Sequence, residues 1–585
     1  MWLWHAYSLG RFVPSLNRSV LCQRTLCFDQ RRYHSQESNH DRYKRIKAEI
    51  ELQMEVPEHF NFAEDIIEKW AKQRPDKVAL HFTDGSTESF ASYSKLYKEA
   101  VLLATGLTNP TPPKCALVIL PKIFEWWAVN VAGSWCGMII SPATTLLTAN
   151  DVAHRIAECG VDCVICDFDT ASRLNDVTKG IPLRIIVSKS DGQVFVASRS
   201  DWTNYDDLIK RAKSIDVEPC HKTKRDDVAQ IFFTSGTTGK PKMVPHTQGS
   251  YGIGHVAAAK FWLDLREDEL IWNISDTGWA KAAWSSLYIP FLSGATVFVH
   301  QMPSFNAEEV LRSLCKHPVN ALCAPPTAYR AMVQCDLEKY KFNSLRRCVS
   351  AGEPLNPEVI EKWTLSTGLQ IFEGYGQSET TLLCGTGEGV EIRPGSMGKP
   401  APGYNLKIID SNWQELGPNE EGFLAVSLSE GHPIGLFKGY MANEKQTSEV
   451  FVGDYYLTGD RAYYDTDGYF WFVGRADDVI ISSGYRIGPF EVESALLEHP
   501  AVAESAAVSS PDSLRGEVVK AFVVLAKEYR NHNLDLLIKE LQDHVKKTTA
   551  PYKYPRKVEF VESLPKNISG KIRRVVLRNK EWGKS

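Results

Sequence analysis

A short stretch rich in glycine and hydroxyl side chains has the composition of a phosphate-binding loop. It reads Thr234-Ser235-Gly236-Thr237-Thr238-Gly239-Lys240-Pro241-Lys242. Small residues let backbone N–H groups and hydroxyls approach a phosphate closely, and the two lysines add positive charge. The apolar run Ile231-Phe232-Phe233 comes directly before it and predicts a buried strand. A plain polar turn between strands is the alternative, but a turn does not need glycines, hydroxyls and lysines together.

The loop differs from the Walker motif, which is another phosphate-binding loop. That motif has four residues between its glycines, followed by Lys and then Ser or Thr. Here two residues separate Gly236 from Gly239, and Pro241 follows Lys240. Because proline cannot donate an N–H group, the usual loop-to-helix cradle is disfavoured. We therefore expect a phosphate loop of another kind.

Two further motifs lie downstream and add candidate nucleotide-binding groups. The first follows a predicted strand at residues 369–372 and reads Glu373-Gly374-Tyr375-Gly376-Gln377-Ser378-Glu379. The second places Asp460 at the end of an apolar run, and a predicted hairpin turn at residues 464–469 leads from it to Arg475. A carboxylate at a strand end is able to accept bonds from both ribose hydroxyls. We therefore predict that Asp460 binds the ribose and that Arg475 binds a phosphate or the ribose.

Together these motifs resemble those of the adenylate-forming superfamily, which includes acyl-CoA synthetases, peptide-synthetase adenylation domains and luciferases. The resemblance covers about residues 57–580, and Asp276-Thr277-Gly278-Trp279 is similar to the mitochondrial medium-chain acyl-CoA synthetases in particular. It implies that the turn at residues 350–355 and Tyr375 flank adenine and that Ser378 contacts the α-phosphate. It also implies that Glu379 binds Mg²⁺, an ion that takes few ligands from protein.

The resemblance assigns further site residues. Lys571, which follows Ser569 and Gly570, matches the adenylation lysine, and Asp477 matches the hinge of the family. His246, Trp279, Ser378 and Arg486 are implied to contact the acyl or thiol substrate, although His246 and Trp279 could instead belong to the core. The residues expected to bind CoA are Ser483, Gly484, Tyr485, Arg515, Lys546, Tyr554, Pro555 and Arg556.

Apolar runs that alternate with helical patterns predict an α/β fold. We expect a large N-terminal α/β domain of several subdomains at residues 57–476. A small, mobile α+β domain is expected at residues 477–585, with a helix that opens at Pro489 and a strand at residues 518–524. A second helix there is expected to present one apolar face, formed by Leu534, Leu537, Ile538, Leu541 and Val545.

The composition excludes several other classes of protein. A hydrophobic content of 43% with 24% charged residues is typical of a soluble globular chain, and 585 residues predict more than one domain. The net charge of −4 gives no reason to expect nucleic acid as a partner. The thirteen cysteines are odd in number and widely spread, which argues against a disulfide framework. Cys163 and Cys166 lie in a strand-like run, so they face opposite sides and do not form half a metal site.

Two segments of the sequence bear on where in the cell the protein is found. The uncharged run at residues 126–150 contains glycines, serines and a proline, so we expect a buried helix, a short strand and a loop rather than a membrane span. Residues 1–36 carry five arginines, a single acid at Asp29 and no long apolar core. That composition is typical of a mitochondrial transit peptide, and a disordered basic tail is the alternative. With the resemblance, it implies a place in the mitochondrial matrix.

The resemblance implies an ATP-dependent ligase that joins a fatty acid, of medium chain length, to CoA through an acyl-AMP intermediate. Two alternatives remain. One is a CoA ligase for an aryl acid of the benzoate type. The other is a catalytically silent homologue that binds nucleotide and CoA, and the presence of Glu379, Asp460, Arg475 and Lys571 argues against it. An adenylation domain serving a carrier protein would be expected to adjoin a phosphopantetheine-accepting module, and no such module follows Lys571.

Overall fold

The structure is a computed structural model that describes residues 37–108, 111–187, 201–234, 241–482, 485–513, 515–567 and 571–584. Three predictions therefore fall on residues outside the described ranges. They are the transit peptide at residues 1–36, the centre of the phosphate loop (Ser235, Gly236, Thr237, Thr238, Gly239 and Lys240), and the Ser483-Gly484 pair of the CoA site.

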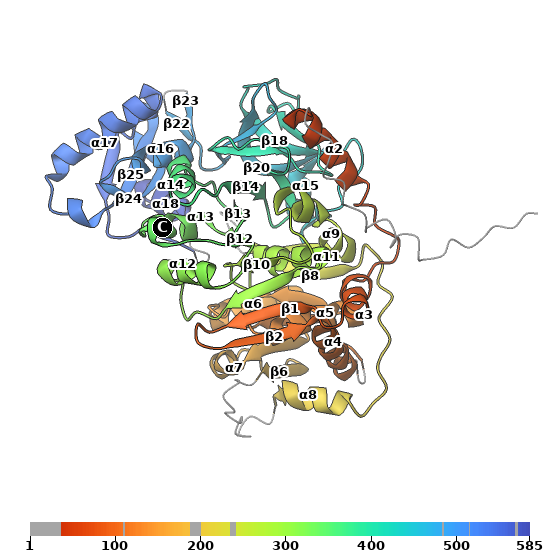
Figure 1. Cartoon of the computed structure of the whole chain (residues 1–585). Helices are drawn as coiled ribbons and strands as arrows, with labels where there is room; N and C mark the ends of the chain where they lie inside the picture. The colour runs from red at the N-terminus through yellow and green to blue at the C-terminus, as the bar shows by residue number, and fades with distance from the viewer. Residues whose placement is uncertain are drawn as a thin grey trace, which may run out of the picture.

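One sheet uses the strands predicted in the first part of the chain. Its order is β7 (Thr203–Asn204), β6 (Leu183–Val187), β5 (Cys163–Asp167), β3 (Cys115–Ile119), β4 (Ile139–Pro142), β8 (Val228–Thr234) and β9 (Lys242–Thr247). All neighbouring pairs are parallel except β8 and β9. These elements form the orange and yellow region at the bottom of Figure 1.

Strand β3 shows why these runs are continuously apolar. Its even-numbered residues pack in a cluster with α4 (Tyr93–Leu107) and α5 (Phe124–Cys136). Its odd-numbered residues pack in another cluster with α6 (Ala149–Cys159) and α7 (Phe168–Leu174). A parallel strand covered by helices on both faces must be apolar at every position. The predicted α/β architecture is therefore confirmed, and the uncharged run at 126–150 forms α5, β4 and a loop, as expected.

A larger sheet passes through the centre of the molecule. Its order is β17 (Leu406–Ile409), β18 (Gly422–Ser427), β20 (Tyr455–Tyr464), β21 (Phe470–Arg475), β16 (Ser396–Pro400), β15 (Leu382–Gly385), β14 (Ile371–Gly376), β13 (Arg347–Ala351), β12 (Ala321–Ala324), β10 (Leu270–Asn273), β11 (Thr296–His300), β1 (Val78–Thr83) and β2 (Glu88–Ser92). The strands from β14 to β1 are parallel. The carboxyl ends of neighbouring parallel strands meet at one edge, so β13 and β14 bring their following loops together.

The C-terminal elements form a separate small α+β unit, drawn in blue in Figure 1. Its sheet has the order β23 (Tyr485–Ile487), β22 (Ile480–Ser482), β25 (Gly516–Leu525) and β24 (Val502–Asp512), with β26 (Lys557–Phe560) paired to β25. Helices α16 (Pro489–Leu497), α17 (Leu534–Thr548) and α18 (Arg574–Glu581) complete it. The cluster that includes Ile480, Leu496 and Leu541 draws all its buried members from residues after 479, which explains how this unit keeps a core of its own.

Some sequence predictions need correction. Strand β14 begins at Ile371 rather than at residue 369. The apolar face of α17 is narrower than expected, because Leu537, Leu541 and Val545 are buried whereas Leu534 is 44% exposed. Leu534 is the first residue of the helix, and the residues that the helix contributes to the buried cluster come only from its later positions. Within the described ranges, no helix is long and apolar enough to cross a membrane.

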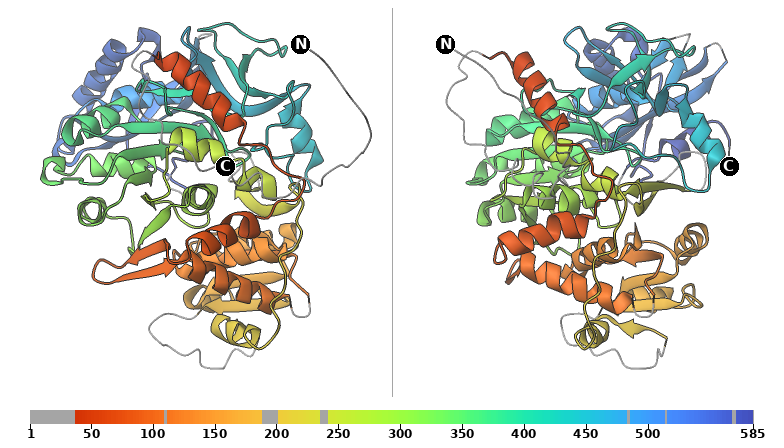
Figure 2. Two further views of the ribbon diagram at one scale, coloured as in Figure 1. Left: turned by 45° about the vertical axis from the view of Figure 1, so that its right-hand side comes forward. Right: turned by 90° about the vertical axis from the view of Figure 1, so that its right-hand side faces the viewer.

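The N-terminal helix α2 (Asn39–Glu51) packs far from the elements that follow it in sequence. Figure 2 shows this red helix lying along the green and cyan elements of the later chain. The hydroxyl of Tyr43 donates to the carbonyl of Pro400 at 2.8 Å, and Arg42 pairs with Glu388. The helix therefore joins the beginning of the described chain to its middle.

Candidate active site

A deep cleft of about 2940 Å³ separates the large N-terminal part of the chain from the C-terminal unit. Residues from both parts line it. Among the predicted nucleotide-binding residues, the cleft is lined by Thr234, Pro241, Lys242, Glu373, Gly374, Tyr375, Gly376, Gln377, Ser378, Glu379, Asp460, Arg475 and Lys571. The structure thus brings together groups that lie more than three hundred residues apart in the sequence.

The ends of the phosphate loop sit on a hairpin that opens into this cleft. Strands β8 and β9 are antiparallel, and Thr234 at the end of β8 is paired with Lys242 at the start of β9. The side chains of β8 are buried up to Phe233, as the apolar run predicted. This register fixes both ends of the loop at the cleft wall.

Asp460 is the centre of a polar network on the cleft wall. Only 3% of the residue is exposed. Its carboxylate accepts bonds from the hydroxyl of Tyr375, from Nε2 of Gln377 at 2.9 Å and from Nη1 of Arg475 at 3.1 Å. Burial raises the pKa of Asp460, and the cation of Arg475 acts in the opposite direction. The network fixes a carboxylate and a guanidinium side by side, as the register of β20 and β21 requires.

Glu379 lies on the cleft floor and is held by a tyrosine. The hydroxyl of Tyr440 donates to its Oε1 at 2.9 Å, and the ammonium of Lys242 lies 4.7 Å from the centre of the Tyr440 ring. Burial raises the pKa of Glu379, whereas the hydroxyl of Tyr440 lowers it. A hard carboxylate facing the cleft fits the ligand chemistry of Mg²⁺, which takes few protein oxygens beside phosphate and water.

His246 lies behind the cleft wall rather than on it. It is completely buried, and its Nε2 donates to the backbone carbonyl of Ser378 at 2.6 Å, while Nδ1 faces the hydroxyl of Ser250 at 3.2 Å. Burial lowers the pKa of His246 to about 4, so the imidazole is neutral at pH 7. The contact places His246 as a support for the Ser378 backbone. Trp279, in contrast, lines the cleft itself.

Lys571 reaches the cleft from the other end of the chain. Its backbone is fixed by two bonds with Asn567, of 2.9 Å and 2.8 Å. Burial lowers the pKa of Lys571, and the charges of Glu353 and Asp460 raise it in part, so its ammonium lies within the electrostatic reach of these two carboxylates. This arrangement presents the predicted adenylation lysine to the cleft.

The residues predicted to bind CoA lie elsewhere. Within the described residues, Tyr485, Arg515, Lys546, Tyr554, Pro555 and Arg556 are not among those that line the cleft. Arg486, which was predicted to contact the substrate, does not line the cleft either. Several of them form an exposed aromatic and basic surface, in which the rings of Tyr485 and Tyr552 stack at 4.4 Å. Lys546 and Arg556 lie over the ring of Tyr554, at 4.4 Å and 4.8 Å from its centre. The C-terminal unit thus turns its Lys571 face to the cleft and its Tyr485 face away.

Polar contacts hold the C-terminal unit in this orientation. Arg578 donates to the carbonyl of Asp477 and to Oδ1 of Asp478, both at 2.6 Å, so α18 fastens the predicted hinge. Across the cleft, Nδ2 of Asn356 donates to the hydroxyl of Ser494 at 3.0 Å. The bond between Asn356 and Ser494 joins the two parts of the chain and would have to break if the C-terminal unit rotated, whereas the contacts of Arg578 lie at the hinge and within that unit.

Sequence reasoning missed two residues of the site. Tyr440 was not identified, because a tyrosine in an irregular segment carries no signal for the residue that it contacts. Lys281 also lines the cleft; its ammonium donates to the carbonyl of Ala351 at 2.8 Å, and its pKa is lowered mainly by burial. A lysine in a short alanine-rich segment normally indicates a solvated charge, and only the fold shows that Lys281 faces the end of β13.

Comparisons with known proteins agree with this geometry. Residues 67–441 match the family described as AMP-binding enzyme, and residues 491–571 match the AMP-binding enzyme C-terminal domain. The mitochondrial acyl-coenzyme A synthetase ACSM3 of Mus musculus is 48% identical over 559 residues, which cover 93% of this chain and 94% of the relative.

Two solved structures extend the comparison to the fold. The acyl-CoA synthetase of Brucella canis is 32% identical, with a TM-score of 0.70 and coverage of 93% of this chain and 99% of that chain. The anthranilate CoA ligase AuaEII, solved with anthranoyl-AMP, is 27% identical, with a TM-score of 0.81 and coverage of 90% and 98%. The chain therefore has the adenylate-forming fold and belongs to the family of AMP-binding enzymes, alongside the mitochondrial acyl-coenzyme A synthetases.

Proposed function

We propose that this protein is an AMP-forming acid–thiol ligase that converts a fatty acid, of medium chain length, into its CoA thioester. The observation that carries the proposal is the cleft in which Lys571 faces the Asp460–Arg475 pair and Glu379. In this proposal Lys571 and Arg475 place positive charge near the phosphates, Asp460 places a carboxylate near the ribose, and Glu379 places one near the metal ion. The relatives named as acyl-CoA synthetases support the same activity.

In the first step, a carboxylate oxygen of the acid attacks the α-phosphorus of ATP, and the bond to pyrophosphate breaks. Negative charge builds on the phosphoryl oxygens, so cations fixed around them lower the barrier. In this proposal Lys571 and the loop at residues 234–242 supply that stabilisation. Asp460 holds the ribose, Tyr375 flanks the adenine and Ser378 contacts the α-phosphate. Glu379 would hold Mg²⁺, which supplies charge neutralisation when bound.

In the second step, the thiol sulfur of CoA attacks the acyl carbon, the bond to AMP breaks, and the thiol proton is released to solvent. The predicted CoA residues face away from the cleft in this structure, so the step requires the C-terminal unit to rotate about Asp477. Rotation would break the bond between Asn356 and Ser494 and carry Lys571 out of the cleft. Such a movement acts as a gate between the two half-reactions.

We propose the mitochondrial matrix as the location, on the basis of the basic N-terminal segment and of relatives that are named mitochondrial. An aliphatic acid is the favoured substrate because of the similarity to those relatives. An aryl acid is the second candidate, because Trp279 and Trp284 line the cleft and the AuaEII neighbour is named as an anthranilate ligase.

A panel of acids tests the proposal. Purified full-length protein is given MgATP, CoA and either straight-chain acids from C2 to C16 or benzoate, and AMP and thioester are measured together. We expect AMP and thioester in equal amounts, with the highest turnover for a straight-chain acid of intermediate length. Highest turnover with benzoate would instead favour the aryl acid. Absence of both products with every acid would overturn the proposed activity.

A further inference from the structure

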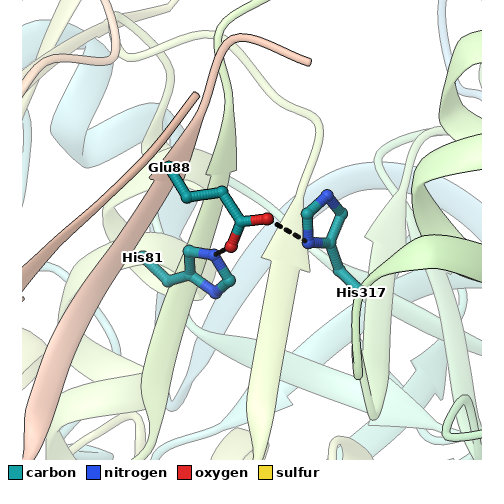
Figure 3. A group of neighbouring side chains, drawn as sticks. All are labelled: His81, Glu88 and His317. Carbon is teal, nitrogen blue, oxygen red and sulfur yellow. Dashed lines mark hydrogen bonds and ion pairs between the residues drawn. The ribbon is translucent and has the colours of Figure 1, made fainter. Parts of the chain in front are cut away.

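A cluster of two histidines and one glutamate lies outside the cleft. His81 comes from β1, Glu88 from the start of β2, and His317 from the residue that follows α12 (Ala307–Lys316). Figure 3 shows the Glu88 carboxylate between the two imidazole rings. Its Oε2 lies 2.8 Å from Nε2 of His81, and its Oε1 lies 3.7 Å from Nδ1 of His317. None of the three lines the cleft, so the proposed ligase reaction does not use them.

The fold fixes this convergence. In the antiparallel hairpin of β1 and β2, His81 is opposite Phe90 and Thr83 is opposite Glu88. Residues two apart on a strand face the same side, so Glu88 lies diagonally next to His81 on one face. His317 is fixed separately, because its N–H donates to the carbonyl of Ser313 at the end of α12 at 2.9 Å. The cluster therefore joins two elements that are more than two hundred residues apart.

Packing also holds both imidazoles in place. The ring of Phe298 on β11 lies 5.1 Å from the ring of His81 and 4.8 Å from that of His317. The two histidines are 7% and 5% exposed, whereas Glu88 is exposed enough to admit an ion from solvent. His81 also borders an open pocket of about 370 Å³, which offers a second route to the ligand atoms.

The types of the three side chains suit metal binding. Imidazole nitrogen and carboxylate oxygen are both ligands of zinc. Two imidazoles and one carboxylate form the ligand set found in zinc sites that keep one position for water.

The distances are compatible with such a site. One ligand atom from each residue can be chosen so that all three lie within 4.8 Å of one another. Zinc binds imidazole nitrogen and carboxylate oxygen at about 2.0–2.2 Å, so tetrahedral ligand atoms lie roughly 3.3–3.6 Å apart. The distances from the Glu88 oxygens to the two ring nitrogens, 2.8 Å and 3.7 Å, lie on either side of this spacing. Within the described residues, no other group of three histidine, cysteine or acidic side chains meets this distance criterion.

We propose that His81, Glu88 and His317 bind one Zn²⁺ ion, with a fourth position taken by water, and that the ion fastens the β1–β2 hairpin to the end of α12. The alternative is that Glu88 merely bridges two histidines through hydrogen bonds. The zinc site predicts stoichiometric metal binding that depends on Glu88, whereas a bridge of hydrogen bonds alone predicts no such binding.

The test uses the full-length protein after treatment with a chelator and removal of that chelator. Zn²⁺ binding is measured by competition with a fluorescent zinc indicator, for the unmodified chain, for Glu88→Gln and for His154→Gln. The control residue His154 is half-buried on α6 near Glu158, and it belongs neither to the cleft lining nor to the cluster. We expect one equivalent of Zn²⁺ in the unmodified chain and in His154→Gln. Affinity should fall by more than about 100-fold in Glu88→Gln, because loss of a group that merely orients a ligand already costs about 10–100-fold.

Cobalt provides a second measurement that does not depend on a variant. Co²⁺ bound to the unmodified chain should show the visible bands of a tetrahedral site with nitrogen and oxygen ligands. A strong near-ultraviolet band from thiolate ligands would place the metal on cysteines and overturn the proposal. Absence of stoichiometric Zn²⁺ binding, or equal affinity in the unmodified chain and Glu88→Gln, would also overturn it.

Discussion

The hydrogen bond between Tyr440 and Glu379 predicts a change in pH dependence that can be measured. Replacing Tyr440 by Phe removes the hydroxyl that donates to Oε1 of Glu379 at 2.9 Å and keeps the ring beneath Lys242. A hydrogen bond to a charged group contributes about 1.5–3 kcal/mol. At 1.36 kcal/mol per pKa unit, its loss should raise the pKa of Glu379 by about 1–2 units.

The direction of the pH shift follows from the protonation state of Glu379 that the proposed reaction needs. Glu379 must be ionised to hold a cation, and burial already raises its pKa. The variant therefore keeps a protonated Glu379 up to a higher pH than the unmodified enzyme. We expect the acid limb of kcat/KM for MgATP, which reports the free enzyme, to move upward by about 1–2 pH units, with activity recovering on the alkaline side.

The assay is acid-dependent pyrophosphate release between pH 5 and pH 9, followed without CoA so that the first half-reaction is isolated. Tyr329→Phe is the matched control, because its hydroxyl donates to the carbonyl of Val349 inside the core and has no carboxylate partner there. It should leave the acid limb in place. An equal loss of activity at every pH in Tyr440→Phe would refute the role given to the Tyr440–Glu379 bond.

Three further outcomes follow from the site and its supports. Lys571→Ala should slow acyl-adenylate formation by about 10²–10³-fold and retain most thioester formation from supplied acyl adenylate. The control Lys566→Ala, which removes a lysine paired with Glu504, should slow neither step. Equal loss of both steps in Lys571→Ala would contradict the proposed alternation. The pKa of His246 is near 4 in the folded state and 6.5 as the ordinary value, so the unfolded state binds more protons between these values. The free energy of unfolding should therefore rise with pH across this range, by up to about 3 kcal/mol more than in His246→Gln. An unfolding free energy that changes in parallel with pH in the two proteins would disprove it. Arg574→Ala removes the guanidinium that lies 2.6 Å from the buried carboxylate of Glu493. The free energy of unfolding of the C-terminal unit should fall by about 3–5 kcal/mol. An unchanged urea midpoint would show that this ion pair does not stabilise the unit.

Local patterns in the sequence were sufficient for much of the fold. The run at residues 163–166 predicts a strand because a parallel strand between two helical layers must be apolar throughout. The Asp84-Gly85 pair between β1 and β2 is a sequence signal for a hairpin turn, because glycine tolerates the positive φ of 93° found there. Helical periodicity was wrong for Leu534, since it shows which residues share a helix face but not how much of that face is covered.

The site was predictable only in part. Asp460, Arg475 and Glu379 were identified from short motifs, and the structure places them in one cleft. Lys281 and Tyr440 were not, because their significance comes from partners that are distant in sequence. The support of Ser378 by His246 was also beyond reach, since a histidine after a strand gives no sign of whether it faces a cavity or the core.

The central claim is that the cleft activates a carboxylic acid by joining it to AMP. The most direct test is exchange of labelled pyrophosphate into ATP by the purified full-length protein, with Mg²⁺ and without CoA, in the presence and absence of a straight-chain acid. The account predicts exchange that requires the acid and accompanies the formation of acyl-AMP detectable by mass spectrometry. Exchange that is absent with every acid in the panel would contradict the account.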